Sequence, residues 1–435
     1  MAGRKERAKG GGTMKRPYDV TVIGGGPAGL AAALKADEAG ARVLLIEREA
    51  RMGGVLKQCI HDGFGLIRYA ERLSGPEYVE RFTESLRQRN ITCLVQTFVT
   101  AVDKRKEGFL LTVVNRNGVA AYWTKTIVLA TGCRERTAKQ VAIHGTRPAG
   151  IFTAGTAQHL VNLSGQMPTK RCVILGSGDI GLIMARRLTL EGAEVAGVYE
   201  AKAEPSGLTR NIAQCLKDYD IPLHLSHTVT RVSGDGRLDA VEVARVDGAM
   251  HPVPGTEKRI SCDALILSVG LIPENEIAES LGVPMDQGTR GPVCNSDFMT
   301  DVPGVFSCGN ALHVSDLVDY VSESGELAGA AAAGYRPEAV RMHDVPIRPD
   351  GSLQYIVPQK INVHDGKETV LYFRSRHTVR DGTFAIEADG KELLEKHYRN
   401  LRPPEMERIE LDFSRFGLKE DARITARIRQ KEGIR

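Results

Sequence analysis

The segment Tyr18-Asp-Val-Thr-Val-Ile-Gly24-Gly-Gly26-Pro-Ala-Gly29-Leu30 begins as an apolar run and continues into a turn of spaced glycines. An alanine-rich stretch with helical character follows, and a second apolar run, Val43-Leu-Leu-Ile46, leads to the acid Glu47. Strand, G-x-G-x-x-G turn, helix, strand and acid in this order predict a unit that binds a dinucleotide. Gly24 would permit the tight turn, Gly26 the approach of a pyrophosphate, and Gly29 close packing of helix on strand.

The chain carries the same pattern again at Arg171-Cys-Val-Ile-Leu-Gly176-Ser-Gly178-Asp-Ile-Gly181-Leu182. Its second apolar run, Val195-Ala-Gly-Val-Tyr199, also closes on an acid, Glu200. A carboxylate at this place binds a free ribose 2′-hydroxyl and repels a 2′-phosphate, which favours NAD over NADP, although Lys202 lies close by. Two such units predict a chain that brings two dinucleotides together, so that a hydride can pass between them.

Composition excludes several classes of protein. The 435 residues are 42% hydrophobic and 26% charged, and the net charge of +4 is too small to indicate nucleic-acid binding. The sequence shows no apolar run near the ~20 residues of a membrane span, no secretory signal and no clustered metal ligands. The eight cysteines form no C-x-x-C pair, which indicates reduced thiols in a cytoplasmic protein.

The order of the motifs predicts an α/β fold with two Rossmann-like three-layer dinucleotide-binding domains, the second inserted in the first. We expect separate strands at 122–124 and 126–131 in the first domain. Beyond residue 345, β-prone runs predict a small C-terminal β-rich domain with turns at Asp350, Asp365, Asp381 and Asp389, each followed by glycine. The expected boundaries are 1–15 for a disordered basic leader, 16–145 with 290–340 for the first dinucleotide-binding domain, 146–289 for the second, and 345–435 for the β-rich domain.

Further motifs between the two glycine turns and after them complete a family pattern. They are Ala130-Thr131-Gly132, Ser268-Val-Gly270 and Val305-Phe-Ser-Cys-Gly309-Asn310. With them, the chain from Tyr18 to about Gly334 resembles the flavoproteins with two dinucleotide-binding domains that are related to pyridine nucleotide–disulfide oxidoreductases. The segments 58–65 and 313–321 resemble a bacterial subgroup that accompanies a glycerol-3-phosphate dehydrogenase-like flavoprotein and a small cysteine-rich protein. That subgroup is distantly similar to the α subunits of opine, cyanide-forming and amino-acid dehydrogenases.

The resemblance implies that the first domain binds FAD and the second NAD, with NADP less favoured. It places FAD against Gly24, Gly26, Pro27, Ala28, Gly29, Glu47, Arg48, Gly53, Gly54, Val99, Ala130, Thr131, Gly132, Gly309, Asn310, Leu317 and Val318. It places NAD against Gly176, Gly178, Asp179, Ile180, Gly181, Glu200 and Gly270. The stretch after Asp316 is expected to begin a helix whose N–H groups face the flavin, with Asp319 as an alternative N-cap.

Three departures from the family pattern limit the chemistry. Cys59 follows the Gly53-Gly54 turn without a second cysteine, and disulfide exchange needs both an attacking and a resolving thiol. Asn310 stands where the family usually has aspartate, so a hydrogen-bond acceptor remains but its charge is lost. No cysteine follows Cys308, so the β-rich domain cannot hold a thiolate-ligated iron–sulfur cluster.

Cys59 and His61 are the candidate catalytic residues, as a redox thiol and a proton donor. The alternative is that Cys59 only packs and His61 only supports its neighbours through hydrogen bonds. His313 is open in the same way: it contacts the flavin ring or caps its loop.

These motifs predict an FAD-dependent oxidoreductase that exchanges hydride with NAD(H), as the electron-transfer subunit of a multi-subunit dehydrogenase of the glycerol-3-phosphate, opine or amino-acid type. Two alternatives remain: a self-contained NADH oxidase or peroxidase that uses Cys59, and a flavin-bound redox-sensing or assembly protein without turnover. The β-rich domain would serve to dock the partner, or else to cover an apolar surface or form a homo-oligomer contact.

Overall fold

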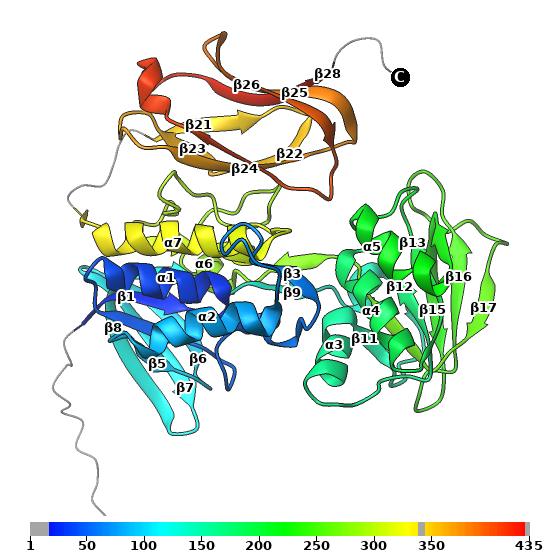
Figure 1. Ribbon diagram of the computed structural model, residues 1–435. Coiled ribbons are helices and arrows are strands. Elements are labelled where there is room, and N and C mark those ends of the chain that lie inside the picture. The colour runs from blue at the N-terminus through cyan, green and yellow to red at the C-terminus, as the bar shows by residue number, and fades with distance from the viewer. Residues whose placement is uncertain (1–16, 338–343, 431–435) are drawn as a thin grey trace, which may run out of the picture.

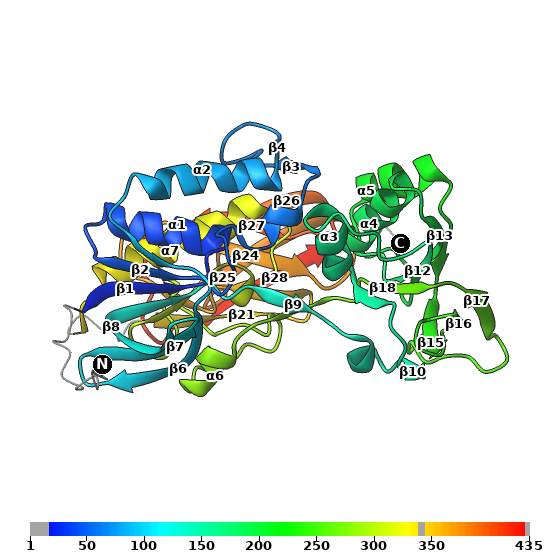
Figure 2. The same ribbon diagram turned by 90° about the horizontal axis from the view of Figure 1, so that it is seen from below.

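The computed structural model describes residues 17–337 and 344–430, so the predicted leader at 1–15 lies outside the described residues. In Figure 1 a first unit carries α1 (Pro27–Glu38), α2 (Gly75–Arg87) and α7 (Val318–Gly334). A second unit stands beside it, and a β-rich unit of residues 344–430 lies over α7. Figure 2 shows the second unit at one end of the first from another side. The α/β class predicted from the glycine motifs is confirmed.

The first unit is built on a seven-stranded sheet whose order is β5-β2-β1-β8-β7-β6, with β20 also pairing with β8. Its strands are β1 (Tyr18–Ile23), β2 (Val43–Ile46), β5 (Thr92–Leu94), β6 (Phe98–Arg105), β7 (Gly108–Asn115), β8 (Gly118–Leu129) and β20 (Val305–Ser307). Its helices are α1 (Pro27–Glu38), α2 (Gly75–Arg87), α6 (Glu276–Ser280) and α7 (Val318–Gly334), and a short hairpin pairs β3 (Asp62–Phe64) with β4 (Leu73–Ser74).

Small residues bring α7 against α1. A Cβ on Gly325 would lie 2.1 Å from the Ala28 carbonyl oxygen, and one on Gly329 would lie 2.2 Å from the Ala32 oxygen. The backbones of the two helices are therefore in direct contact, and this contact places the N-terminus of α7 near the first glycine turn.

The prediction of two separate strands at 122–124 and 126–131 was wrong, because one strand, β8, runs without a break from Gly118 to Leu129. Its first half pairs antiparallel with β7 and its second half pairs parallel with β1 and β20. Thr124 pairs with both Phe109 and Tyr18, so the hydrogen-bonded ladder continues where exposed Lys125 interrupts the apolar pattern.

The second unit lies between β8 and β20 in the chain, and an antiparallel pair, β9 (Cys133–Glu135) with β19 (Leu271–Pro273), connects it to the first. Its parallel sheet has the order β11-β18-β12-β13-β14, and a second sheet has the order β10-β15-β16-β17. These strands are β10 (His144–Gly145), β11 (Ile151–Thr153), β12 (Arg171–Leu175), β13 (Glu194–Glu200), β14 (Leu223–Leu225), β15 (His227–Ser233), β16 (Ala240–Arg245), β17 (Lys258–Ser261) and β18 (Ala264–Leu267). Its helices are α3 (Ala154–Asn162), α4 (Asp179–Leu190) and α5 (Thr209–Cys215).

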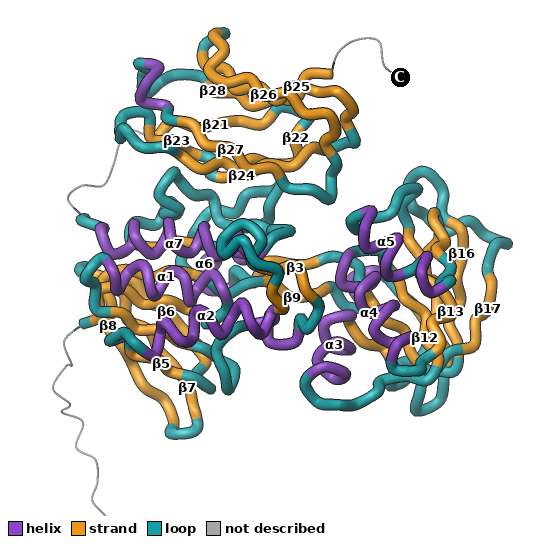
Figure 3. Tube along the Cα trace, in the orientation of Figure 1, coloured by secondary structure: helices purple, strands orange, loops and turns teal. Residues whose placement is uncertain are grey.

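The β-rich unit is a sandwich, shown in Figure 3 as two layers of strands. One sheet has the order β23-β21-β28-β25-β26 and the other β22-β24-β27. The strands are β21 (Asp344–Pro349), β22 (Leu353–Val357), β23 (Lys360–Asn362), β24 (Thr369–Ser375), β25 (Val379–Ala388), β26 (Lys391–Leu401), β27 (Glu407–Leu411) and β28 (Ile424–Gln430).

Of the four Asp-Gly pairs predicted to form turns in this unit, three lie between strands and one does not. Asp389 lies in the turn between β25 and β26, as predicted, but Asp381 lies inside β25 with φ of +54°. The ladder of β25 with β26 has paired residues on both sides of Asp381, at Arg380 and Gly382, and the ladder with β28 begins at Gly382. Pairing with neighbouring strands thus overrides the local turn preference.

Candidate functional site

The first glycine turn is shaped partly by the chain itself. Gly24 has φ of +109°, and a Cβ there would lie 2.2 Å from the Ala130 carbonyl oxygen. A Cβ on Gly29 would lie 1.8 Å from the Gly24 oxygen. Internal packing therefore requires glycine at both positions, because any side chain would separate α1 from β1 and from the end of β8.

Gly26 differs from these two glycines. Its φ is −75°, which any residue adopts, and the nearest atom to a Cβ there is the Gly54 Cα at 3.8 Å. The protein interior leaves room for a side chain at Gly26, so a glycine there serves something that approaches from outside. Gly26 is the N-cap of α1, followed by Pro27 and Ala28, and the free N–H groups of a helix start suit a pyrophosphate. The cradle therefore fits the FAD that the sequence predicts.

The predicted ribose acid is held in place by main-chain groups. Glu47 is 6% exposed, and its Oε2 accepts from the Gly25 N–H at 2.6 Å while its Oε1 accepts from the Glu49 N–H at 2.7 Å. These bonds fix the carboxylate at the end of β2 beside the turn. Arg48 instead reaches Glu274 at 2.9 Å, and Val99 is buried in the apolar core of the sheet.

The later flavin motifs converge on the same edge of the sheet. Ala130 packs against the first glycine turn, Thr131 donates to the Glu274 carbonyl oxygen at 2.6 Å, and Gly132 has φ of +74°. Gly53, with φ of +116°, precedes a 3-10 turn, Gly54–Gln58, whose first residue faces Gly26. These segments surround the start of α1.

Gly309 and Asn310 join this edge to the loop before α7. A Cβ on Gly309 would lie 2.7 Å from the Ala28 Cβ, so the motif packs on α1. The Asn310 Oδ1 accepts from the Ser315 N–H at 3.0 Å, and its Nδ2 donates to the Cys133 Sγ at 3.6 Å. The amide therefore organises the chain that leads to α7.

The start of α7 corrects one expectation. Leu317 is the N-cap and Val318 the first helical residue, without a side-chain cap. Asp319 is therefore not the N-cap: it lies inside the first turn, is 6% exposed, and its Oδ2 accepts from the Ile67 N–H at 3.0 Å.

The second glycine turn repeats the first. Gly176 has φ of +96°, and a Cβ there would lie 2.0 Å from the Ser268 carbonyl oxygen. A Cβ on Gly181 would lie 2.6 Å from the Ser268 Cβ, and one on Gly178, the N-cap of α4, 3.2 Å from the Ser268 Oγ. Gly270, at the end of the following segment, has φ of +101°. The turn thus packs tightly on the strand end that precedes Gly270.

Glu200 is held by a serine that sequence reasoning missed. Its Oε2 accepts from the Ser177 N–H at 3.0 Å and from the Ser177 Oγ at 2.6 Å. Its Oε1 accepts from the main-chain N–H of Lys202 at 3.1 Å. Ser177 occupies an unspecified position of G-x-G-x-x-G, which is why the motif carries no signal for it.

Asp179 and Ile180 begin α4 immediately after this turn. The Asp179 Oδ1 accepts from the Leu208 N–H at 2.9 Å and from the Asn211 Nδ2 at 2.7 Å. Asp179 therefore ties the segment before α5 to the start of α4, while Ile180 packs on the apolar core of the unit.

Cys59 lies in an environment that keeps its thiol protonated. Burial raises the pKa of Cys59 to about 12, and its Sγ donates to the Val55 oxygen at 3.4 Å and the Gln158 Oε1 at 3.8 Å. The thiolate is the reactive form, so this environment favours a packing residue over a redox thiol.

His61 lies two residues beyond Cys59. Its ring packs on Phe64 at 4.9 Å, and its Nδ1 is 3.2 Å from the Asp62 carbonyl oxygen. Burial lowers the pKa of His61, which favours a neutral imidazole.

A polar joint between the two units accompanies this segment and was not anticipated. The Gln58 Nε2 donates to the Gly155 oxygen at 3.0 Å and to the Gln158 Oε1 at 3.1 Å, and the Asn162 Nδ2 donates to the Gln58 oxygen at 2.8 Å. The joint fixes the stretch around Cys59 against α3. Lone amide side chains 100 residues apart give no pattern in a sequence.

His313 is placed by the β-rich unit. It is 1% exposed, and its ring centroid lies 5.1 Å from that of Tyr372 and 5.9 Å from that of Tyr355. Burial, followed by the charge of Arg374, lowers the pKa of His313 to about 3, so it is a neutral core residue. Packing under the sandwich thus replaces the loop-capping role that was one of its two expected roles.

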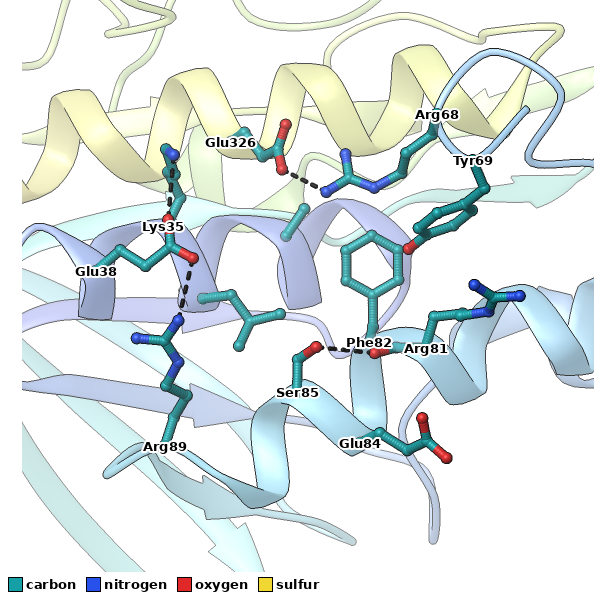
Figure 4. Close-up of a pocket in the computed structure, with 12 residues that line it drawn as sticks. Lys35, Glu38, Arg68, Tyr69, Arg81, Phe82, Glu84, Ser85, Arg89 and Glu326 are labelled. Carbon is teal, nitrogen blue, oxygen red and sulfur yellow. Dashed lines mark hydrogen bonds and ion pairs between the residues drawn. The ribbon is translucent and has the colours of Figure 1, made fainter. Parts of the chain in front are cut away.

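A hollow of about 380 Å³ lies between α1, α2 and α7, where Figure 4 shows its charged lining. Arg68 pairs with Glu326 at 2.5 Å, and Arg89 pairs with Glu38 at 3.2 Å. None of the predicted cofactor residues lines it, and its charges are largely satisfied by each other. We therefore assign it no part in dinucleotide binding.

Within residues 17–337 and 344–430, no helix is long and apolar enough to cross a membrane, and no cluster of three metal-ligating side chains occurs.

Comparisons with known proteins agree on the family. Residues 18–333 match the family model described as pyridine nucleotide-disulphide oxidoreductase. An opine oxidase subunit from Agrobacterium tumefaciens is 25% identical over 72% of this chain and 65% of its own length. The hydrogen cyanide synthase subunit HcnB from Pseudomonas protegens is 27% identical over 60% of this chain and 58% of its own length, so the match spans less than two thirds of both relatives.

Reductases with the same fold are also similar. Thioredoxin reductase of Treponema pallidum is 27% identical over 74% of this chain and 98% of its own length. The solved thioredoxin reductase of T. acidophilum has a TM-score of 0.59 at 22% identity, covering 74% of this chain and 99% of that one, which shows the fold. Members of this family bind FAD and NAD(P) and are oxidoreductases. The chain, matched over residues 18–333 and carrying both glycine turns, belongs to the pyridine nucleotide-disulphide oxidoreductase family.

Proposed function

We propose that this protein passes hydride between NAD(H) and a bound FAD, as the electron-transfer subunit of a larger dehydrogenase. We assign FAD to the first unit, expected at 16–145 with 290–340, and NAD to the second, expected at 146–289. In the structure α6 packs with the first unit and β10 pairs within the second. The observation that carries the proposal is the pair of glycine turns, each with a buried acid held beside it, Glu47 in one unit and Glu200 in the other. When bound, FAD would supply the hydride-accepting ring.

The residues of the chain bind and orient the two nucleotides. The gap in front of Gly26 admits a pyrophosphate, and the start of α1 offers it N–H groups. The α7 N-terminus, from Leu317 and Val318, favours negative charge at its end, which suits the reduced flavin edge. The amide joint around Gln58 holds the two units together at the segment between these sites.

Disulfide and peroxide chemistry are disfavoured by the environment of Cys59. Its thiol is held protonated, and its hydrogen bonds go to a carbonyl and an amide oxygen rather than to a second thiol or a base. Electrons that enter this FAD would then leave to another flavoprotein or to NAD⁺ directly.

Membership in a larger assembly rests on the relatives. The matching proteins from Agrobacterium tumefaciens and Pseudomonas protegens are each named as one subunit of an oxidase or synthase. We propose a flavoprotein dehydrogenase of the glycerol-3-phosphate, opine or amino-acid type as the partner, with a small cysteine-rich protein, in the cytoplasm. Affinity purification from the native cell tests this: a flavoprotein recovered in equal amount supports it, and a chain recovered alone, or only as a homo-oligomer, contradicts it.

Glu200 should make the protein prefer NADH. In anaerobic rapid mixing, we expect NADH to reduce the flavin at lower concentration than NADPH, because a carboxylate repels a 2′-phosphate. Glu200→Gln keeps a hydrogen-bond acceptor but removes the charge, so the ratio of the two dissociation constants should narrow by about tenfold, or about 1.4 kcal/mol. Glu194→Gln, at the exposed start of the same strand, is the matched control and should leave the ratio unchanged. Tighter binding of NADPH by the unmodified protein would show that Glu200 does not select the nucleotide.

A further inference from the structure

A buried guanidinium joins the β-rich unit to the loop that precedes α7. Arg374, on β24, is 9% exposed. Its Nε donates to the Tyr355 hydroxyl at 2.8 Å, and its Nη1 donates to the main-chain oxygens of Pro403, at 3.2 Å, and Pro404. Its Nη2 donates to the Val314 oxygen at 3.1 Å and to the Asp316 carboxylate. One side chain therefore fixes two segments of the sandwich and one loop of the first unit.

Asp316 strengthens this connection from the other side. Its second carboxylate oxygen accepts from the Met406 N–H at 2.5 Å, so the carboxylate is bonded to the sandwich twice. Buried charges are costly unless they are paired and hydrogen-bonded, so the pair of Arg374 and Asp316 holds its geometry tightly.

The loop to which Arg374 is hydrogen-bonded runs from the Gly309 motif to α7. At one point the Asn310 Oδ1 accepts from the Ser315 N–H at 3.0 Å, and on both sides of that point Arg374 holds Val314 and Asp316. The next residue, Leu317, is the uncapped N-cap of α7. The β-rich unit therefore contacts the loop immediately before the first turn of α7.

We propose that Arg374 is a positioning residue that aims the N-terminus of α7 at the flavin, so that the β-rich unit sets the reduction potential of the flavin. This rests on the proposed FAD site. A helix N-terminus carries partial positive charge whose effect falls off within the first turn, so a small displacement of the loop weakens its stabilisation of the negatively charged reduced flavin.

A second anchor provides a matched control. Arg408 also joins the sandwich to α7, through two bonds to Glu323 at 2.8 and 2.5 Å, but Glu323 lies more than a turn beyond the helix start. Arg374→Lys and Arg408→Lys both keep the positive charge and both lose the planar fork. Only Arg374→Lys is expected to loosen the loop before α7, because Arg408 does not contact that loop.

The experiment measures the midpoint potential of the bound flavin by equilibration with reference dyes, and the FAD dissociation constant of the apoprotein. We expect Arg374→Lys to lower the preference for reduced flavin about tenfold, equivalent to about 30 mV for a two-electron couple. Arg408→Lys should leave the potential at the unmodified value. Tyr355→Phe is nearly isosteric and removes one hydrogen bond of Arg374. It should lower the preference for reduced flavin about threefold, a smaller effect than loss of the whole guanidinium fork.

Each outcome decides the proposal. It is overturned when Tyr355→Phe and Arg374→Lys both keep the unmodified potential, or when Arg408→Lys shifts it equally. Tyr355→Phe alone gives the answer when Arg374→Lys does not fold. An unmodified chain that takes up no FAD would instead contradict the proposed function, which the same reconstitution reveals before any variant is compared.

Discussion

Gly26→Ala is expected to yield a folded protein that has lost its yellow flavin. A Cβ at Gly26 meets no protein atom closer than 3.8 Å, and φ of −75° suits alanine, so the chain itself tolerates the change. The added methyl group would stand where the pyrophosphate approaches the start of α1. We expect FAD to bind about 100-fold more weakly, a loss of about 2.7 kcal/mol.

Flavin content after purification and fluorescence titration of the apoprotein measure this effect. Gly334→Ala, at the C-terminal end of α7, is the control, because a Cβ there meets nothing within 4 Å. It should keep the unmodified flavin content and thermal stability. A Gly26→Ala protein with full flavin content would place the cofactor elsewhere.

Removing the β-rich unit should destroy the flavoprotein rather than only its docking. In a chain ending at Arg341, the first unit loses the apolar side chains that complete the core of α1 and α7, which are Tyr355, Val357, Val370, Tyr372 and Met406. Burial of a large apolar side chain is worth about 2 kcal/mol. Losing these five contacts would remove much of the free energy of unfolding of a domain, which is roughly 5–15 kcal/mol.

The truncated chain is therefore expected to aggregate or to purify without FAD, because Glu323 and Asp316 would also lose the arginines that pair with them. Solubility, flavin content and NADH-dependent dye reduction check this. A soluble, flavin-bound core that reduces dye normally and loses only its partner would show that the unit serves docking alone. Of the three roles expected for this unit, which are docking a partner, covering an apolar surface and forming a homo-oligomer contact, the structure favours covering an apolar surface.

The glycine turns made the core of the fold predictable because each fixes strand, turn and helix over a short stretch. Gly29 is required by a contact with Gly24 inside the same turn, and Gly24 by a contact with Ala130 at the end of the adjacent strand β8. The β-rich unit was predicted only as a class. Asp381 looked like a turn because the flanking ladders that hold it in β25 come from strands that the local sequence does not reveal.

Parts of the site were hidden for a related reason. Arg374 lies in an apolar, β-prone run, and its ion-pair partner Asp316 precedes it by 58 residues. No residue near Arg374 in the sequence therefore predicts a buried ion pair. Ser177 is unspecified in its motif, and its bond to Glu200 depends on how β12 and β13 lie side by side. Long-range side-chain contacts become visible only once the strands are placed in register.

Anaerobic titration of the purified, FAD-bound protein with NADH tests hydride transfer between the two predicted sites most directly. We expect one FAD in each chain, complete bleaching of its visible absorbance by one equivalent of NADH, and recovery of the oxidised spectrum on adding an electron acceptor. A chain that binds no FAD, or a bound FAD that neither NADH nor NADPH reduces, would contradict the assignment of this protein as a hydride-transferring oxidoreductase.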